Sequence, residues 1–173
     1  KLYSPVSSQV YMIWSDDRGE SWSAPVPLGS PVPETGLKRI FPAVAVRPGG
    51  AVDVVYAESR EVQLTADPDD VECSLSLTSG NFRNSPVRSL VDLWWVQSTD
   101  GGKTFSPRVR VTSETSDWCA THFDFAGFLF PNYAEYLGIF PGKDRTFLVW
   151  GDGRNGVPDA FFTTLEAGTK RPQ

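Results

Sequence analysis

The sequence predicts an all-β fold built from repeated four-stranded antiparallel units, and three observations point to it. Fifteen glycines and fourteen prolines make up about 17% of the 173 residues, against a usual share of about 12%, which is typical of a turn-rich protein. The apolar runs are short, rich in valine and aromatic residues, and bounded by glycine, proline or aspartate, which favours strands over helices. Several of these runs recur with the same flanking residues.

Nine strands are expected, in three groups along the chain. The first group is a pair, the second has four strands and the third has three. Their expected ranges are about 9–15 and 22–29, then 42–47, 51–58, 91–97 and 104–112, and finally 136–140, 145–151 and 159–165.

One eight-residue element occurs twice, at 15–22 and 98–105, with the pattern S-x-D-x-G-x-[S/T]-aromatic. Its aspartate can accept hydrogen bonds from backbone N–H groups of the following turn, and its glycine permits positive φ. The aromatic residue is expected to pack between strands as an apolar plug. We interpret the element as a structural turn. The residues given this role are Ser15, Asp17, Gly19, Trp22, Ser98, Asp100, Gly102 and Phe105.

Two further internal matches set the order of strands within a unit. Residues 54–60 match 148–154, and residues 92–95 match 159–162. Within a four-stranded unit, the first match lies at the end of the second strand, and the other match lies in the third strand. The S-x-D-x-G element joins the third strand to the fourth. A repeated four-stranded antiparallel unit of this kind is typical of a β-propeller blade.

The S-x-D-x-G-x-T-W pattern resembles the Asp-box, or BNR repeat, of the sialidase superfamily. The ending over 136–154 also resembles the last blade of many secreted bacterial Asp-box proteins. The resemblance covers the chain except residues 61–90 and implies a sialidase-like β-propeller, six-bladed when complete. It implies an extracellular or periplasmic location, although the chain itself carries no visible signal peptide. Asp-box propellers include enzymes and non-enzymes, so the fold alone does not assign an activity.

About two and a half blades are expected here, as part of one propeller domain spanning 1–173. The expected parts are a half blade at 9–29, a full blade at 37–112 with its insertion at 61–90, a last blade at 113–165 and a tail at 166–173. Each absent strand would leave a neighbour's backbone groups unpaired. We therefore expect the rest of the propeller to come from a longer chain, a partner chain or a second copy, and not a self-contained monomer.

The long connections at 29–41, 59–91 and 112–136 would all lie at one edge of the blades, opposite the S-x-D-x-G turns. Long loops on one edge of a rigid scaffold are where function is expected, although they could merely cap the propeller. The resemblance to sialidases implies arginines that grip a substrate carboxylate, an aspartate acid and a tyrosine nucleophile near a carboxylate. The catalytic candidates are Arg39, Arg60, Asp67, Asp69, Tyr133 and Arg154.

Each candidate also has a structural interpretation. Arg39 lies in Lys38-Arg39-Ile40-Phe41-Pro42, which has one residue more than the F/Y-R-I-P motif of sialidases, and it could be solvent-exposed. Arg60 and Arg154 recur at matched positions and could pair with Glu58 or Asp152 or hold a loop. Asp67 and Asp69 could lie in a solvated turn, and Tyr133 could be a core residue. Tyr136, beside the nucleophile candidate, aligns with a core position.

Two classes of function stay open. The first is a sialidase-like propeller that acts on or binds glycans, possibly as an exo-glycosidase, and the second is a non-catalytic scaffold for protein binding or assembly. The aromatic residues Phe123, Phe125, Phe128 and Phe130 could stack on sugar rings, or could form an inter-blade plug or a subunit contact.

Composition and charge argue against several other classes of protein. Hydrophobic residues at 40% suffice for a packed core, which excludes general disorder. A formal net charge of −5 argues against nucleic-acid partners, and no apolar run of about 18 residues spans a membrane. With one histidine, His122, and no CxxC spacing, we expect no metal and no other cofactor. Cys73 and Cys119 could form one disulfide or remain two thiols.

Overall fold

The computed structural model of the chain describes residues 7–29, 37–63, 87–118, 122–125, 128–131 and 136–166. Within these ranges all regular structure is β, the strands of every sheet pair antiparallel, and helices are absent. The described residues therefore include no helix with the length and apolar character to cross a membrane. The all-β class expected from the sequence is confirmed.

The largest sheet contains the central strands of the chain. Its order is β3 (Leu37–Val46), β4 (Val52–Gln63), β5 (Val87–Ser98) and β6 (Val109–Arg110), and β7 (Ser116–Asp117) also pairs with β5. Valine and aromatic residues fill β4 and β5, as suits strands that pack on both faces. The fourth strand is much shorter than the expected range 104–112, because the second S-x-D-x-G turn and Pro107 occupy its start.

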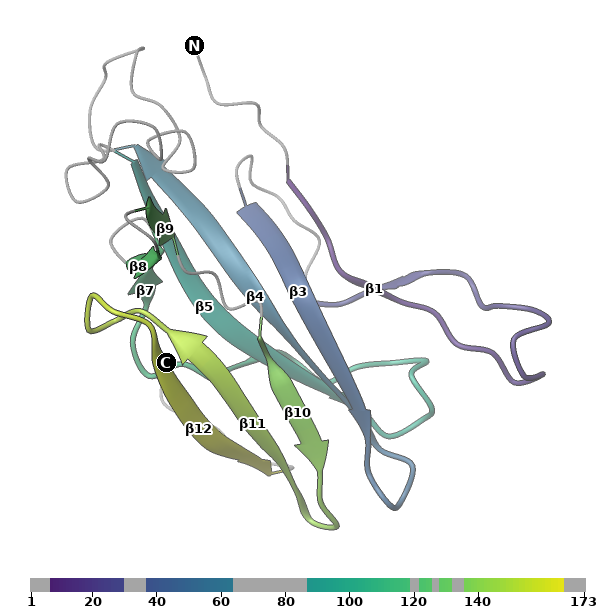
Figure 1. Cartoon of the computed structure of the whole chain (residues 1–173). Coiled ribbons are helices and arrows are strands. Elements are labelled where there is room, and N and C mark those ends of the chain that lie inside the picture. The colour runs from purple at the N-terminus through teal and green to yellow at the C-terminus, as the bar shows by residue number, and fades with distance from the viewer. Residues whose placement is uncertain are drawn as a thin grey trace.

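Three smaller sheets accompany it (Figure 1). A three-stranded sheet has the order β10 (Gly138–Pro141), β11 (Arg145–Asp152) and β12 (Asp159–Glu166). A two-stranded sheet pairs β1 (Tyr11–Met12) with β2 (Val26–Pro27), and another pairs β8 (His122–Phe125) with β9 (Phe128–Pro131). The β8–β9 hairpin falls in a segment expected to be a loop, which is a correction to the sequence analysis.

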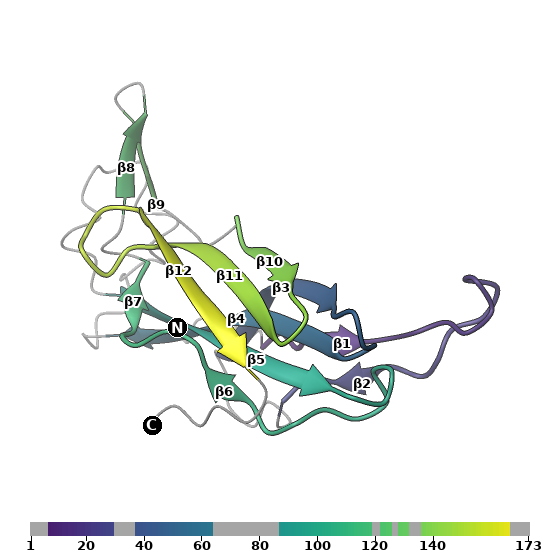
Figure 2. The same cartoon turned by 90° about the horizontal axis from the view of Figure 1, so that it is seen from below.

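The β1–β2, β3–β6 and β10–β12 sheets stack face to face in three layers, with the β3–β6 sheet in the middle (Figures 1 and 2). Successive strand residues point to opposite faces, so Val55 and Ala57 of β4 face the β10–β12 sheet while Val54 and Tyr56 face the β1–β2 pair. The core on the first side consists of Val55, Ala57, Val91, Leu93, Trp95, Val111, Trp118, Leu148, Trp150 and Leu165. The core on the second side consists of Val10, Leu28, Val52, Val54, Tyr56 and Val96.

The two larger sheets share one register. Tyr56 pairs with Trp94 across β4 and β5, and the matched residues Trp150 and Phe161 pair across β11 and β12. Each sheet also turns the same face toward the sheet before it, because Tyr56 faces β1–β2 and Trp150 faces the β3–β6 sheet. The internal repeats read from the sequence are therefore structurally equivalent elements in these two sheets.

A buried polar network ties the two larger sheets together. Asp53 of β4 is 0% exposed and accepts hydrogen bonds from Arg47 Nε at 2.6 Å, Trp95 Nε1 at 2.9 Å and the Thr146 hydroxyl of β11. Arg47 in turn donates to the carbonyl of Leu165 in β12 at 3.2 Å. The carboxylate and the guanidinium thus satisfy one another and also bind both sheets, as a buried ion pair requires.

The extra residue in the Lys38–Pro42 stretch has a place in the fold. Ile40 pairs with Ala57 and Ala43 pairs with Val55, so Phe41 and Pro42 together lie opposite a single residue of β4. This is a β-bulge, and Phe41 adopts a positive φ of 51° there. The stretch therefore lies inside β3, which begins earlier than the expected range 42–47.

Both S-x-D-x-G turns are built with the same hydrogen bonds. The Asp17 carboxylate accepts from the Ser21 N–H at 2.9 Å, and the Asp100 carboxylate accepts from the Thr104 N–H at 2.9 Å. The glycines adopt positive φ, 92° at Gly19 and 91° at Gly102. Hydrogen bonds from the hydroxyl and the N–H of Thr104 hold the pKa of Asp100 well below its ordinary value. The structural interpretation of the turns agrees with this geometry.

Two aromatic residues depart from expectation. Trp22, expected as an apolar plug, is 60% exposed, whereas its counterpart Phe105 packs against the core between β1–β2 and the central sheet. The difference arises because the first turn extends beyond the central sheet (Figure 1). Tyr136, aligned with a core position, is 87% exposed just before β10, so that expectation was wrong.

The turns agree in part with the expected arrangement, in which the long connections lie at the edge opposite the S-x-D-x-G turns. The β3–β4 turn, the β10–β11 turn and the second S-x-D-x-G turn lie toward one end of the strands, and the β11–β12 turn lies toward the other (Figure 1). The connections at 64–86 and 132–135 lie outside the described residues.

Replacing Asp100 with alanine is expected to lower the melting temperature by a few degrees, because three donors from Lys103 and Thr104 lose their acceptor. Thermal melts measure the effect, with Thr99→Ala in the same exposed turn as the control. The folded pKa of Asp100 is depressed, so its stabilisation is complete above the unfolded value of about 3.9 and is lost as pH falls below it. The difference between wild type and Asp100→Ala should thus shrink between about pH 5 and pH 2. Equal melting at neutral pH would contradict the structural interpretation.

Candidate site around Arg39, Glu58 and Arg108

An arginine–carboxylate cluster lies on the face of the central sheet that meets β1–β2. Glu58 of β4 is nearly buried and accepts a hydrogen bond from Arg39 Nε at 2.9 Å, and it also binds Arg108, which precedes β6. Arg39 reaches it directly because β3 and β4 place the two residues opposite each other. With two guanidinium groups and one carboxylate, the cluster carries an excess positive charge in a chain whose net charge is −5.

Arg39 forms the floor of this cluster. It is 3% exposed, and its NH1 donates to the Gln9 side chain at 2.7 Å and to the carbonyl of Leu28 at 3.1 Å. The alternative of a solvent-exposed Arg39 is therefore wrong. The guanidinium is held by three groups of the chain, so its position is set before any ligand arrives.

Arg108 covers the top of the cluster and lies flat on an aromatic ring. Its guanidinium carbon is 3.9 Å from the ring centre of Trp94, a close cation–π contact. Its side chain keeps 30% of its surface exposed, compared with 9% for Glu58 and 1% for Arg39. Arg108 is thus the member of the cluster that an approaching anion would meet.

Tyr56 lies beneath the same cluster. Its side chain is fully buried, and its hydroxyl has no hydrogen-bond partner within the described residues. Burial raises the pKa of this phenol, against the opposing effect of the charge on Arg39. Gly29 passes directly over it: a Cβ at position 29 would lie 2.7 Å from the hydroxyl oxygen, and Gly29 adopts a positive φ of 77°. A glycine is therefore required where the chain crosses Tyr56.

An open groove of about 390 Å³ lies beside Arg108. Val26, Pro27 and Gly29 form one wall, and residues 105–108 form the other. A hollow of this size falls within the range that small ligands occupy, about 300–1,000 Å³. Its walls combine apolar surface from Phe105 and the prolines with one exposed guanidinium, which suits a ring that carries a negative group.

The last sheet repeats the cluster with a different arginine. Asp152, equivalent to Glu58, binds Arg154 NH2 at 2.6 Å, and the guanidinium carbon of Arg154 lies 4.4 Å from the ring centre of Phe161. Burial raises the pKa of Asp152, but hydrogen bonds from Arg154 and Trp150 outweigh burial and hold this pKa below its ordinary value. Its hydrogen bond with Asp152 raises the pKa of Arg154.

The two clusters are alike in geometry but not in sequence position. Arg154 aligns with Arg60, yet Arg108 is the residue that binds Glu58 and stacks on Trp94. Arg60 is exposed at the end of β4, opposite Leu37. The pairing expected for Arg154 with Asp152 is confirmed, whereas the carboxylate of Glu58 binds Arg39 and Arg108.

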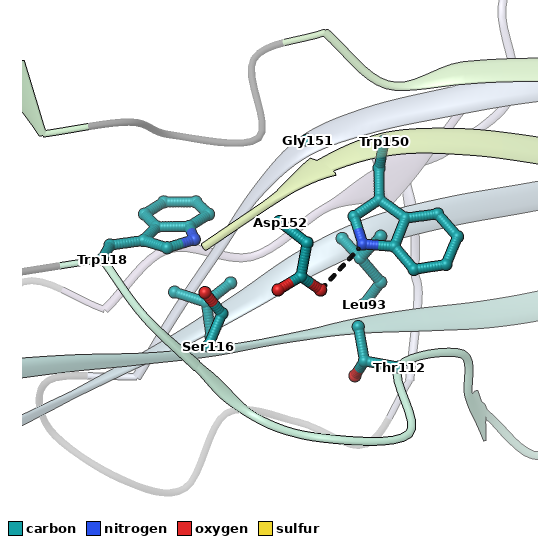
Figure 3. A pocket seen from close by; sticks show the side chains of 8 residues that line it. Leu93, Thr112, Ser116, Trp118, Trp150, Gly151 and Asp152 are labelled. Carbon is teal, nitrogen blue, oxygen red and sulfur yellow. Dashed lines mark hydrogen bonds between the residues drawn. The ribbon is translucent and has the colours of Figure 1, made fainter. Parts of the chain in front are cut away.

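A small cavity of about 10 Å³ lies beside Asp152, between the two larger sheets (Figure 3). The Asp152 carboxylate points between the indole of Trp150 and the hydroxyl of Ser116, and Trp150 Nε1 donates to it at 3.0 Å (Figure 3). Thr112 also lines the space. A cavity of this volume holds about one water molecule and cannot admit a sugar.

The described residues include only three of the six predicted catalytic residues. Arg39, Arg60 and Arg154 occupy three separate positions, each described above. Asp67, Asp69 and Tyr133 lie outside the described residues, as do Cys73 and Cys119. Side chains of the β8–β9 hairpin, including His122 and the four phenylalanines, are also outside. In the described ranges no three or more His, Cys, Asp or Glu side chains are grouped so that they could hold a metal ion.

Sequence reasoning missed Arg108, Tyr56 and the buried pair Arg47–Asp53. A charged residue inside a strand that is otherwise apolar, as Asp53 is in Val52-Asp53-Val54-Val55, is a signal that could have indicated a buried ion pair. Arg108 carries no comparable signal, because its partner Glu58 lies 50 residues away in the chain.

Comparisons with known proteins add little detail. No protein-family model matches the sequence, and no curated protein matches it. Among solved structures, the chain is similar to a protein titled Hadza microbial sialidase Hz136, with a TM-score of 0.49 and 16% sequence identity. The match covers 92% of this chain and 29% of that protein, so the chain spans less than a third of its length.

Proposed function

We propose that this chain is part of a sialidase-like Asp-box β-propeller that binds glycans carrying an acidic sugar. The observation that carries the proposal is the groove beside Arg108, where a partly exposed guanidinium, positioned by Glu58 and Trp94, meets apolar walls. Two Asp-box turns with the same hydrogen bonds, and two sheets with one register, support the propeller assignment. The resemblance to the sialidase superfamily supports an extracellular or periplasmic location.

The chemistry of the groove suits a sugar carboxylate. An arginine binds a carboxylate through parallel N–H···O bonds, and a charge-assisted bond of this kind is worth about 1.5–3 kcal/mol. The guanidinium of Arg108 is already aligned on Trp94, so little conformational freedom would be lost on binding. Phe105 and the prolines supply apolar surface for the faces of a sugar ring. Hydrolysis would further need Tyr133 and one of Asp67 and Asp69 in the roles that the resemblance implies.

Titration of the protein with sialyllactose and with lactose tests the proposal. We expect the acidic sugar to bind more tightly than the neutral one, and Arg108→Ala to weaken its binding about tenfold or more. The control is Lys103→Ala, which removes an exposed positive charge from the second Asp-box turn and should leave binding unchanged. The same samples incubated with a fluorogenic sialoside report hydrolysis. Equal affinity of wild type and a folded Arg108→Ala variant, or no binding of either sugar, would contradict the proposal.

One observation favours the second candidate function, a non-catalytic scaffold. The guanidinium of Arg39, the first catalytic candidate, is buried and held by Glu58, Gln9 and the Leu28 carbonyl. A scaffold would show neither sugar binding nor hydrolysis in the experiment above.

A further inference from the structure

The turn that joins β11 to β12 contains the dipeptide Asn155-Gly156. Of the four asparagines in the chain, only Asn155 is followed by glycine. Both residues are exposed, and Gly156 adopts a positive φ of 83°, which a glycine accepts without strain. A Cβ at position 156 would meet no other described atom within 4 Å, so the turn is open on that side.

An asparagine that precedes glycine can convert its own side-chain amide. The backbone nitrogen of the glycine attacks the amide carbon, its proton passes to the departing nitrogen, and ammonia leaves as a five-membered succinimide ring closes. Water then adds to either carbonyl carbon of the ring and opens it, which gives aspartate or isoaspartate. The reaction consumes only water, and glycine favours it because no side chain shields the attacking nitrogen.

Two hydrogen bonds hold the reacting groups in the folded turn. The backbone nitrogen of Gly156 donates to the carbonyl of Gly153 at 2.8 Å, and the side-chain amide of Asn155 donates to the Asp159 carboxylate at 2.9 Å. The succinimide nitrogen carries no hydrogen, so the first bond is lost during the reaction. The second bond holds the amide toward the start of β12. A hydrogen bond contributes only about 1 kcal/mol, so these bonds slow the reaction without preventing it.

We propose that Asn155 is a site of spontaneous deamidation and that Asp159 restrains the reaction. The product carries a carboxylate where the amide met Asp159, so the repulsion of two like charges replaces a hydrogen bond. Asp159 pairs with Asp152 at the end of the β11–β12 ladder, and Asp152 binds Arg154 NH2 at 2.6 Å. Deamidation therefore acts on the strand end that holds Arg154.

Peptide mapping by mass spectrometry, after incubation at mildly alkaline pH, follows the reaction through the mass difference between an amide and an acid. The peptide with Asn155 should gain this mass in the folded protein, more slowly than in guanidinium chloride. In the unfolded protein, Asn155 should react faster than Asn81, Asn84 and Asn132, which precede phenylalanine, serine and tyrosine. If Asn155 in the folded protein stayed unchanged after the unfolded protein had reacted, the proposal would be overturned.

Asp159→Ala tests the restraint. Removing the acceptor should raise the rate at Asn155 about fivefold, the factor that corresponds to one hydrogen bond of about 1 kcal/mol. Asp144→Ala removes a carboxylate from the other turn of the same sheet and should leave the rate unchanged. Melting curves check folding, and Asp159→Val, whose side chain suits a strand, replaces Asp159→Ala if that variant does not fold. Equal rates in wild type and the folded Asp159 variant would overturn the restraining role of Asp159.

Asn155→Asp carries the product carboxylate from the start. It should melt about 2 °C below Asn155→Ala, which loses the same hydrogen bond without adding a charge. Thermal melts at low salt measure the difference, and added salt should narrow it because exposed charges are screened. Equal melting of the two variants at low salt would overturn the proposed effect on the strand end.

Discussion

Asp53→Ala is expected to destabilise the protein by about 3–5 kcal/mol, because it leaves the buried Arg47 without its carboxylate. Asp53 is fully buried and Arg47 nearly so, and water cannot replace the lost bonds without opening the space between the two larger sheets. The substitution also leaves the indole N–H of Trp95 and the amide of Gln97 without their acceptor. Few single substitutions in the described residues remove so many satisfied bonds at once.

Urea unfolding followed by tryptophan fluorescence measures this effect, since Trp95 binds Asp53 directly. Asp144→Ala is the matched control: it removes an exposed carboxylate from the β10–β11 turn while keeping the backbone carbonyl that Arg47 binds. The control should lie within about 0.5 kcal/mol of wild type. Should Asp53→Ala fail to fold, Asp53→Asn keeps the shape and part of the bonding. A loss below about 1 kcal/mol would show that the network is not buried as described.

Glu58→Ala is expected to destabilise by about 3 kcal/mol, the second largest effect. The substitution removes the carboxylate from Arg39, which is buried, and from Arg108, which is 30% exposed. The cost should be smaller than for Asp53, because Arg39 keeps its bonds to Gln9 and Leu28 and water can reach Arg108.

The same denaturation experiment measures the effect of Glu58. Its control is Glu166→Ala, which breaks an exposed ion pair with Arg145 and should cost less than about 1 kcal/mol. Glu58→Gln keeps an acceptor for Arg39 and should recover part of the loss. If Glu58→Ala were no more harmful than Glu166→Ala, the cluster would not be a buried ion pair, and the alignment of Arg108 in the groove would lose its basis.

The strands and their repeats were predictable because they depend on local patterns. The apolar residues of Val52–Tyr56 allow burial on both faces of β4, and the glycine of each S-x-D-x-G element marks its positive-φ turn. The equivalence of Tyr56 with Trp150 followed from aligned motifs, and the common register of the two sheets confirms it.

Features that depend on packing between layers were not predictable. Whether Trp22 is buried depends on how far the first turn extends beyond the central sheet, and Tyr136 is exposed although its aligned position suggested a core residue. The bulge at Phe41 needed the partner strand, because one extra residue can be absorbed in a loop or in a strand.

The candidate site was predictable only in its residue types. Arginine and carboxylate at the ends of strands indicated ion pairs, but not which ones, because Arg108 reaches Glu58 from the segment that precedes β6. The sequence alignment placed Arg60 where Arg154 lies in the last sheet, and the geometry assigns the equivalent position to Arg108.

The coupling between Asp53 and Thr146 tests most directly whether the two larger sheets stack face to face. The two residues are 93 apart in the chain and touch only if β11 lies on β4. A double-mutant cycle with Asp53→Asn and Thr146→Val should give an interaction energy of about 0.5–3 kcal/mol. Thr146→Val combined with the remote Ser21→Ala should be additive within about 0.5 kcal/mol. Equal additivity for Asp53→Asn and Thr146→Val would contradict the stacking of the β10–β12 sheet on the central sheet, on which the structural repeat depends.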